Sequence, residues 1–73
     1  MKTYITFGQT HIHRVNGKIF DKDCVAVIET KSAEAGRAKA FELFDRKFCF
    51  EYSEENFKKC SMEFFPRGLI DVE

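Results

Sequence analysis

The pair Asn16-Gly17 constrains the fold of this 73-residue chain more than any other feature of its sequence. Both central residues of a type I′ turn need a positive φ, which asparagine and glycine tolerate best. We therefore expect the chain to fold back at this pair into a β-hairpin. His13 would then face Phe20 across the turn, His11 would face Lys22, and residue 9 would face residue 24.

The same hairpin carries the densest run of potential metal ligands in the sequence, because it includes both histidines and one of the three cysteines. Side chains alternate between the two faces of a strand, so His11, His13 and Cys24 would project from one face. Imidazole and thiolate groups are the ligands that zinc prefers in structural sites. A flat ribbon would hold His13 too far from Cys24. The site therefore requires the hairpin to twist, bulge or open into an irregular loop near residues 21–23.

The fourth ligand of this expected zinc site has several candidates. Asp23 and Asp21 are near in sequence, Cys49 is a more distant candidate, and a water molecule could also complete the site. We take Asp23 as the fourth ligand, with His11, His13 and Cys24. The alternative to a metal site is that the histidines are solvated loop residues, or that one fills a polar gap in the core.

Composition indicates one small domain spanning residues 1–73. Hydrophobic residues make up 44% of the chain, which is enough for a packed core, although a domain this short often needs a metal, a disulfide or a partner. Twelve basic and twelve acidic residues give zero net charge, so we expect no direct nucleic-acid binding. The N-terminal residues do not resemble a signal peptide, no run approaches membrane-spanning length, and an odd number of cysteines argues against a disulfide framework. These features predict a soluble, intracellular protein.

Alternation and helical periodicity predict a mixture of strands and helices. Ser32 and Ser53 are good helix N-caps, and Pro66 ends the second helix. The fold class is therefore α+β: a small, mainly antiparallel sheet with two helices on one face and an irregular metal-binding hairpin loop. The expected strands cover residues 2–7, 24–30, 47–52 and 69–72, and the expected helices cover residues 33–46 and 54–65.

The first helix has an aromatic stripe of Phe41 and Phe44, continued by Phe48, which we expect to lie in the core. Gly36 inside this helix is either a small cost in stability or a point of close packing. Cys60 lies on the apolar stripe of the second helix, where the most plausible role is that of a small buried hydrophobic residue.

Catalysis has little support in the sequence, and we expect that the protein is not an enzyme. The chain has no glycine-rich phosphate loop, no metalloprotease helix motif and no serine nucleophile context. A Cys24 thiolate with a histidine base is conceivable. However, so small a domain has little room for an enclosed substrate pocket.

The first third of the chain resembles small proteins encoded by phages and prophages of Gram-positive bacteria. The resemblance runs from Ile5-Thr6-Phe7-Gly8-Gln9 through His11 and His13 to Asn16-Gly17-Lys18 and Asp21-Lys22-Asp23-Cys24. It also includes the Phe-Glu-Leu-Phe helix and the Pro66-Arg67-Gly68 ending. Among such proteins the chain is similar to anti-CRISPR proteins, which include a zinc-containing inhibitor of the type II RNA-guided nuclease.

This resemblance implies a protein that binds a host CRISPR effector nuclease in the host bacterial cytoplasm and inhibits it stoichiometrically. Zinc would brace the hairpin, and the inhibitor would be a monomer. The alternative is a small zinc-binding phage accessory protein with an unassigned or nucleic-acid-associated role. The candidate contact residues are Tyr4, Arg14, Lys18 and Arg67.

Overall fold

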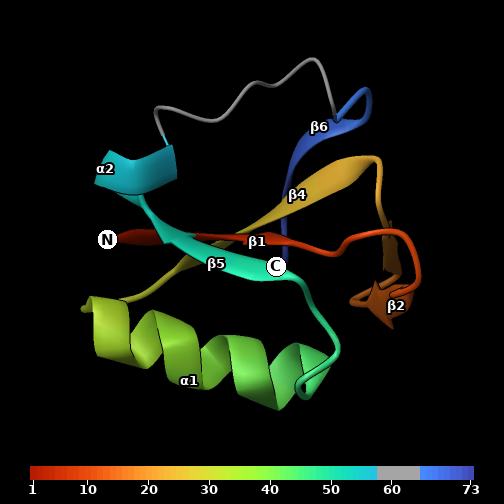
Figure 1. Cartoon of the computed structure of the whole chain (residues 1–73). Coiled ribbons are helices and arrows are strands. Elements are labelled where there is room, and N and C mark those ends of the chain that lie inside the picture. The colour runs from red at the N-terminus through yellow and green to blue at the C-terminus, as the bar shows by residue number, and fades with distance from the viewer. Residues whose placement is uncertain (58–64) are drawn as a thin grey trace.

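The chain forms a four-stranded sheet with a separate two-stranded hairpin beside it, in a computed structural model that describes residues 1–57 and 65–73 (Figure 1). The strands are β1 (Lys2–Thr6), β2 (His13–Val15), β3 (Lys18–Phe20), β4 (Cys24–Glu29), β5 (Phe50–Ser53) and β6 (Gly68–Asp71). The helices are α1 (Ala33–Phe44) and α2 (Glu54–Phe57). The order along the main sheet is β5-β1-β4-β6.

The main sheet is mostly antiparallel, which confirms the predicted α+β class. β1 pairs antiparallel with both β4 and β5, whereas β6 pairs parallel with β4. The apolar run of β4 explains its central position, because its first five residues are all buried. A continuous apolar run is typical of a strand that is covered on both faces.

Helix α1 begins where the sequence predicts and ends earlier. The Ser32 side chain accepts a hydrogen bond from the Ala35 N–H (3.1 Å), as an N-cap does. The helix was expected to reach residue 46, but it ends at Phe44 because Asp45 has φ 59° and ψ −133°. A positive φ is incompatible with a right-handed helix, so the backbone leaves the helix at this residue.

The aromatic stripe of α1 is only partly in the core, which corrects the expectation for this helix. Phe44 is buried among Phe7, Phe20 and Ile5, and its ring meets the Phe7 ring edge-on at 4.9 Å. Phe41 is 38% exposed and contacts Phe48 at the margin of the core, with ring centroids 5.5 Å apart. Because α1 ends at Phe44, Phe48 lies beyond the helix and cannot continue its stripe.

Gly36 is a point of close packing between α1 and the sheet. A Cβ atom at this position would overlap Thr3 Oγ1 and would lie 3.3 Å from Thr30 Oγ1. The helix axis can therefore approach β1 more closely than any side chain larger than hydrogen would allow. Thr3, Ile5 and Phe7 all lie on this side of the sheet.

The two helices lie on opposite faces of the sheet, which corrects the expectation that both would cover one face (Figure 1). Tyr4 points away from α1, since it alternates with Thr3 and Ile5 along β1. Its ring stacks on Phe57 of α2, with centroids 4.2 Å apart and planes 7° from parallel. Tyr52, which is paired with Tyr4 across the strands, also contacts Phe57.

Ser53 caps α2 as predicted, since its Oγ accepts a hydrogen bond from the Asn56 N–H (3.3 Å). The expected continuation of this helix and the interpretation of Cys60 fall on residues 58–64, which lie outside the described residues. Within the described residues, no helix has the length and apolar character needed to cross a membrane.

Candidate functional site

The hairpin forms at the predicted pair, with the predicted register close to the turn. Asn16 and Gly17 have φ values of 53° and 78°, and His13 faces Phe20. The ladder ends at that pair, because His11 precedes β2 and the chain turns away after Phe20. Cys24 does not face Gln9. It is the first residue of β4 in the main sheet, where the buried run pairs with β1 and β6.

His13 is fastened to the segment that follows α1. Its Nε2 lies 2.6 Å from the Lys47 carbonyl oxygen. Because a carbonyl can only accept, Nε2 carries the proton in this contact. The imidazole ring lies edge-on to Phe44 at 5.1 Å and tilted against Phe7 at 5.8 Å. This nitrogen therefore holds the hairpin against the core and offers no lone pair to a metal.

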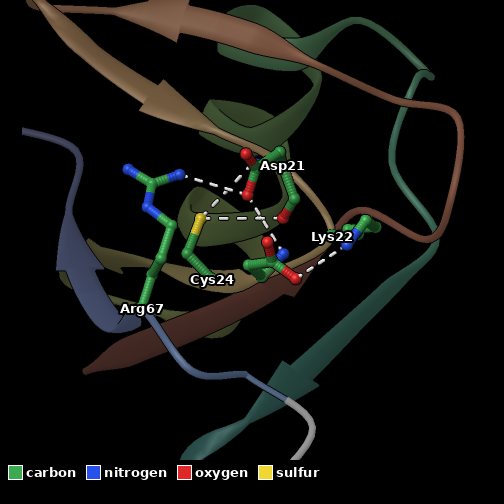
Figure 2. A network of polar contacts seen from close by, with 5 residues as sticks. Asp21, Lys22, Cys24 and Arg67 are labelled. Carbon is green, nitrogen blue, oxygen red and sulfur yellow. Dashed lines mark hydrogen bonds and ion pairs between the residues drawn. The ribbon is translucent and has the colours of Figure 1, made fainter.

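Cys24 is fully buried and its thiol bonds to the turn before it. The Asp21 N–H donates to Cys24 Sγ at 3.4 Å, and the thiol donates to the Asp21 carbonyl at 3.7 Å (Figure 2). Desolvation by burial raises the pKa of the Cys24 thiol above its ordinary value of 9.0, against the lowering effect of the Asp21 backbone contact. The thiolate that a nucleophile or a zinc ligand needs is thus disfavoured here.

The two aspartates shape the turn between β3 and β4 and connect it to β6. The Asp21 carboxylate accepts from the Asp23 N–H (3.0 Å) and from Arg67 Nη1 (3.1 Å), as Figure 2 shows. The Arg67 N–H donates to the Asp23 carbonyl at 2.8 Å. Asp23 also forms an ion pair with Lys22 at 3.0 Å. These contacts hold the start of β6 in register beside β4.

The structure does not bring the predicted zinc ligands together. Within residues 1–57 and 65–73, no three side chains of His, Cys, Asp and Glu form a group that could hold a metal ion. Cys49 is exposed in the segment before β5, and it lies against Gly8. The donor set as placed does not fit a four-ligand site, and zinc binding stays a prediction.

The turn of the hairpin is fastened to the C-terminal end of β6 and to the residues after it. Asn16 Nδ2 donates to the Val72 carbonyl (2.6 Å). Lys18 Nζ donates to the Asp71 and Glu73 carbonyls, at 2.8 Å and 2.6 Å. The hairpin is therefore a clasp that connects the second and third strands to the last one. Sequence reasoning missed this role, since the partners are backbone groups more than fifty positions away.

Of the four predicted contact residues, only Arg14 is left exposed without a stabilising role in the contacts above. Lys18 and Arg67 are used in the clasp and the turn, and Tyr4 is stacked under Phe57. Arg14 faces outward on the hairpin, opposite Ile19, which is 40% exposed. Ile12, just before β2, is 73% exposed.

Two shallow hollows lie beside these elements, and both are open to solvent. One, of about 310 Å³, separates the start of β2 from the end of α1; the other, of about 360 Å³, runs along β5. The first is lined by Ile12, His13, Glu42, Leu43, Phe44, Asp45 and Lys47. The second is lined by Thr6, Gly8, Gln9, Lys22, Cys49, Phe50, Tyr52 and Phe65.

Comparison of the chain with protein-family models, with curated proteins and with solved structures found no match. The phage resemblance therefore remains an expectation from the sequence. In the described residues the buried thiol bonds to backbone groups of Asp21 and the imidazole of His13 bonds to a backbone carbonyl, so neither is paired with the other.

Proposed function

We propose that the protein is an anti-CRISPR inhibitor that binds a host type II RNA-guided nuclease through stoichiometric protein-protein contact. The observation that carries this proposal is the exposed surface of the hairpin, where Arg14 lies opposite exposed Ile19 and Ile12 is exposed just before β2. Apolar side chains around an arginine are typical of the centres of protein interfaces.

The clasp supports the same proposal by an energetic argument. A contact loop that is mobile before binding loses conformational entropy when it is ordered in the complex. Here His13, Asn16 and Lys18 fasten the hairpin to four backbone carbonyls of the body before any partner arrives. The hairpin can then present its outer surface in one shape, and the predicted zinc would brace the same hairpin further.

A cleavage assay with a panel of type II nucleases tests the proposal. We expect inhibition to saturate near one inhibitor per nuclease and not to grow with incubation time. Arg14→Glu should weaken inhibition at least tenfold, as for loss of a central interface arginine. Lys31→Glu is the charge-matched control, because Lys31 is an exposed cation just before α1, at the opposite end of that helix from Phe44 and the hairpin, and it should keep wild-type inhibition.

Thermal unfolding of both variants should match the wild type, which separates loss of contact from loss of fold. Absence of inhibition and of co-purification across the panel would refute the nuclease as target. Equal inhibition by wild type and Arg14→Glu would keep the target but move the contact away from the hairpin.

A further inference from the structure

Asn16 combines a chemically reactive sequence with a structural role in the clasp. An asparagine that is followed by glycine is the most open to attack by its own main chain, because glycine has no Cβ to obstruct the approach. Gly17 is exposed, and a Cβ built on it would meet no atom within 4 Å. The other asparagine of the chain, Asn56, precedes a phenylalanine. Asn16 is therefore the more reactive of the two.

The folded turn holds Asn16 in a conformation that cannot cyclise. Positive φ values at both Asn16 and Gly17, 53° and 78°, define a type I′ turn. In such a turn, Asn16 Cβ and the Gly17 nitrogen lie on opposite sides of the bond between the Asn16 Cα and carbonyl carbon, whereas a succinimide ring requires them on the same side. Asn16 Nδ2 is also bonded to the Val72 carbonyl at 2.6 Å. Cyclisation therefore requires the turn to leave its conformation and this bond to break.

We propose that Asn16 is a site of spontaneous, irreversible deamidation whose rate is set by the clasp. While Asn16 and Lys18 hold the turn to the backbone of residues 71–73, the asparagine is protected. Each opening of the clasp exposes it to attack by Gly17, and the products no longer close the clasp. This inference does not rest on the inhibitory function proposed above, because it concerns contacts within the chain.

The reaction consumes only water. The Gly17 nitrogen gives up its proton and bonds to Asn16 Cγ. The bond from Cγ to Nδ2 breaks, and Nδ2 leaves as ammonia with that proton. One water molecule then opens the succinimide ring. Opening at one carbonyl gives aspartate, and opening at the other gives isoaspartate, in which the main chain runs through the side-chain carbons. Because the ammonia is lost to solvent, the step is not reversed.

Neither product fits the clasp. In aspartate, a carboxylate oxygen replaces the amide donor and would face the Val72 carbonyl oxygen where a 2.6 Å hydrogen bond was. Both oxygens are acceptors, so they repel and no hydrogen bond remains. In isoaspartate the main chain is longer by one carbon, and Val15 can no longer pair with Lys18 across a type I′ turn. Either product therefore releases the end of β6 from the hairpin.

Timed incubation of the folded chain at mildly alkaline pH tests the proposal, with peptide mapping by mass spectrometry to measure conversion at residue 16. Lys18→Met removes the bonds from Nζ to the Asp71 and Glu73 carbonyls and leaves Asn16-Gly17 intact. Because the rate follows the population of the open turn, conversion should be at least about fivefold faster than in the wild type. Lys31→Met is the matched control, since Lys31 is an exposed lysine before α1, and it should keep the wild-type rate.

The same three proteins unfolded in urea give the intrinsic reactivity of the Asn-Gly pair. All three should convert at one rate, which should exceed that of the folded wild type. Equal rates for folded and unfolded wild type would overturn protection by the turn. Equal rates for folded wild type and folded Lys18→Met would overturn control by the clasp.

Asn16→Asp tests the structural consequence separately from the rate, and it serves if Lys18→Met fails to fold. Amides of residues 70–72 should exchange with solvent at least about fivefold faster than in the wild type, as for loss of one hydrogen bond. Asn56→Asp makes the same chemical change at an exposed position of α2 and should leave this exchange unchanged. Wild-type exchange in Asn16→Asp would overturn the inference that deamidation opens the clasp.

Discussion

Residues that the sequence suggests as metal ligands form hydrogen bonds in the folded chain that connect one segment to another. His13 bonds to a backbone carbonyl, and the Asp21 carboxylate is occupied by the Asp23 N–H and by Arg67. Histidine, cysteine and aspartate can serve either role, because the same donor or acceptor atoms bind a metal or complete a buried hydrogen bond. Their neighbours in space decide between the two, and those neighbours are distant in sequence.

The buried Cys24 should make stability depend on pH in the alkaline range. Because its pKa is raised in the folded state, the unfolded chain loses the thiol proton first as the pH increases. Stability is therefore fully present below the ordinary pKa of 9.0 and should fall as the pH rises above it. Urea unfolding between pH 7 and pH 10 measures the slope.

Cys24→Ala is the control for this dependence, and Cys49→Ala is the matched exposed cysteine. Cys24→Ala should be less stable at pH 7 by about 1 kcal/mol, and its stability should decline less steeply above pH 9. Cys49→Ala should retain the wild-type slope. An unchanged slope in Cys24→Ala would mean that another group causes the alkaline loss.

Helix α1 packs closely against strand β1 because Gly36 has no side chain. Helix propensity alone favours alanine at this position by about 1 kcal/mol. The structure predicts instead that alanine is unfavourable at this position, because the added methyl would overlap Thr3 Oγ1. Overpacking of a buried contact costs about 1–3 kcal/mol, which exceeds the propensity gain.

Gly36→Ala should therefore destabilise the protein, by up to about 2 kcal/mol net, in urea unfolding. Thr3→Ala in the same chain should recover part of the loss, since it removes the oxygen that the new methyl meets. The double-mutant cycle isolates this coupling. A Gly36→Ala protein that is more stable than the wild type would show that α1 can move away from β1 at little cost.

At the scale of the whole molecule, polar contacts at both ends of β6 close the fold. The turn at Asp21 holds the start of the strand and the hairpin clasp holds its end. These hydrogen bonds connect the hairpin to the body. Small domains do use metals in this way, and the contribution of a bound metal to folding can exceed that of several hydrogen bonds.

Removal of metal tests whether the fold is closed by the hydrogen bonds alone or also by a bound zinc ion. We expect protein treated with EDTA to keep its melting temperature, because His13 Nε2 and the Cys24 thiol already bond to backbone groups. Elemental analysis of freshly purified, tag-free protein should accompany the measurement. About one zinc per chain, together with a lower melting temperature after EDTA, would instead establish the zinc site predicted from His11, His13, Cys24 and Asp23.

Local chemistry in the sequence was sufficient for the α+β class, for the turn at Asn16-Gly17 and for the start of α1 at Ser32. Turn and cap preferences depend on residues within four positions of each other, so they can be deduced without the fold. Close packing at Gly36 was one of two alternatives, and the contact with Thr3 decided between them.

Only the tertiary structure decided which face each helix covers, where Cys24 lies and what the hairpin holds. Phe57 stacks on Tyr4 across fifty-three positions of chain, and Asn16 reaches the backbone of Val72. The candidate ligands on the hairpin were identified from spacing along one ribbon. The chain leaves that ribbon after Phe20, because the apolar run from Cys24 to Ile28 is buried more favourably beside β1. Burial of that run, a property of the whole molecule, separates Cys24 from the histidines.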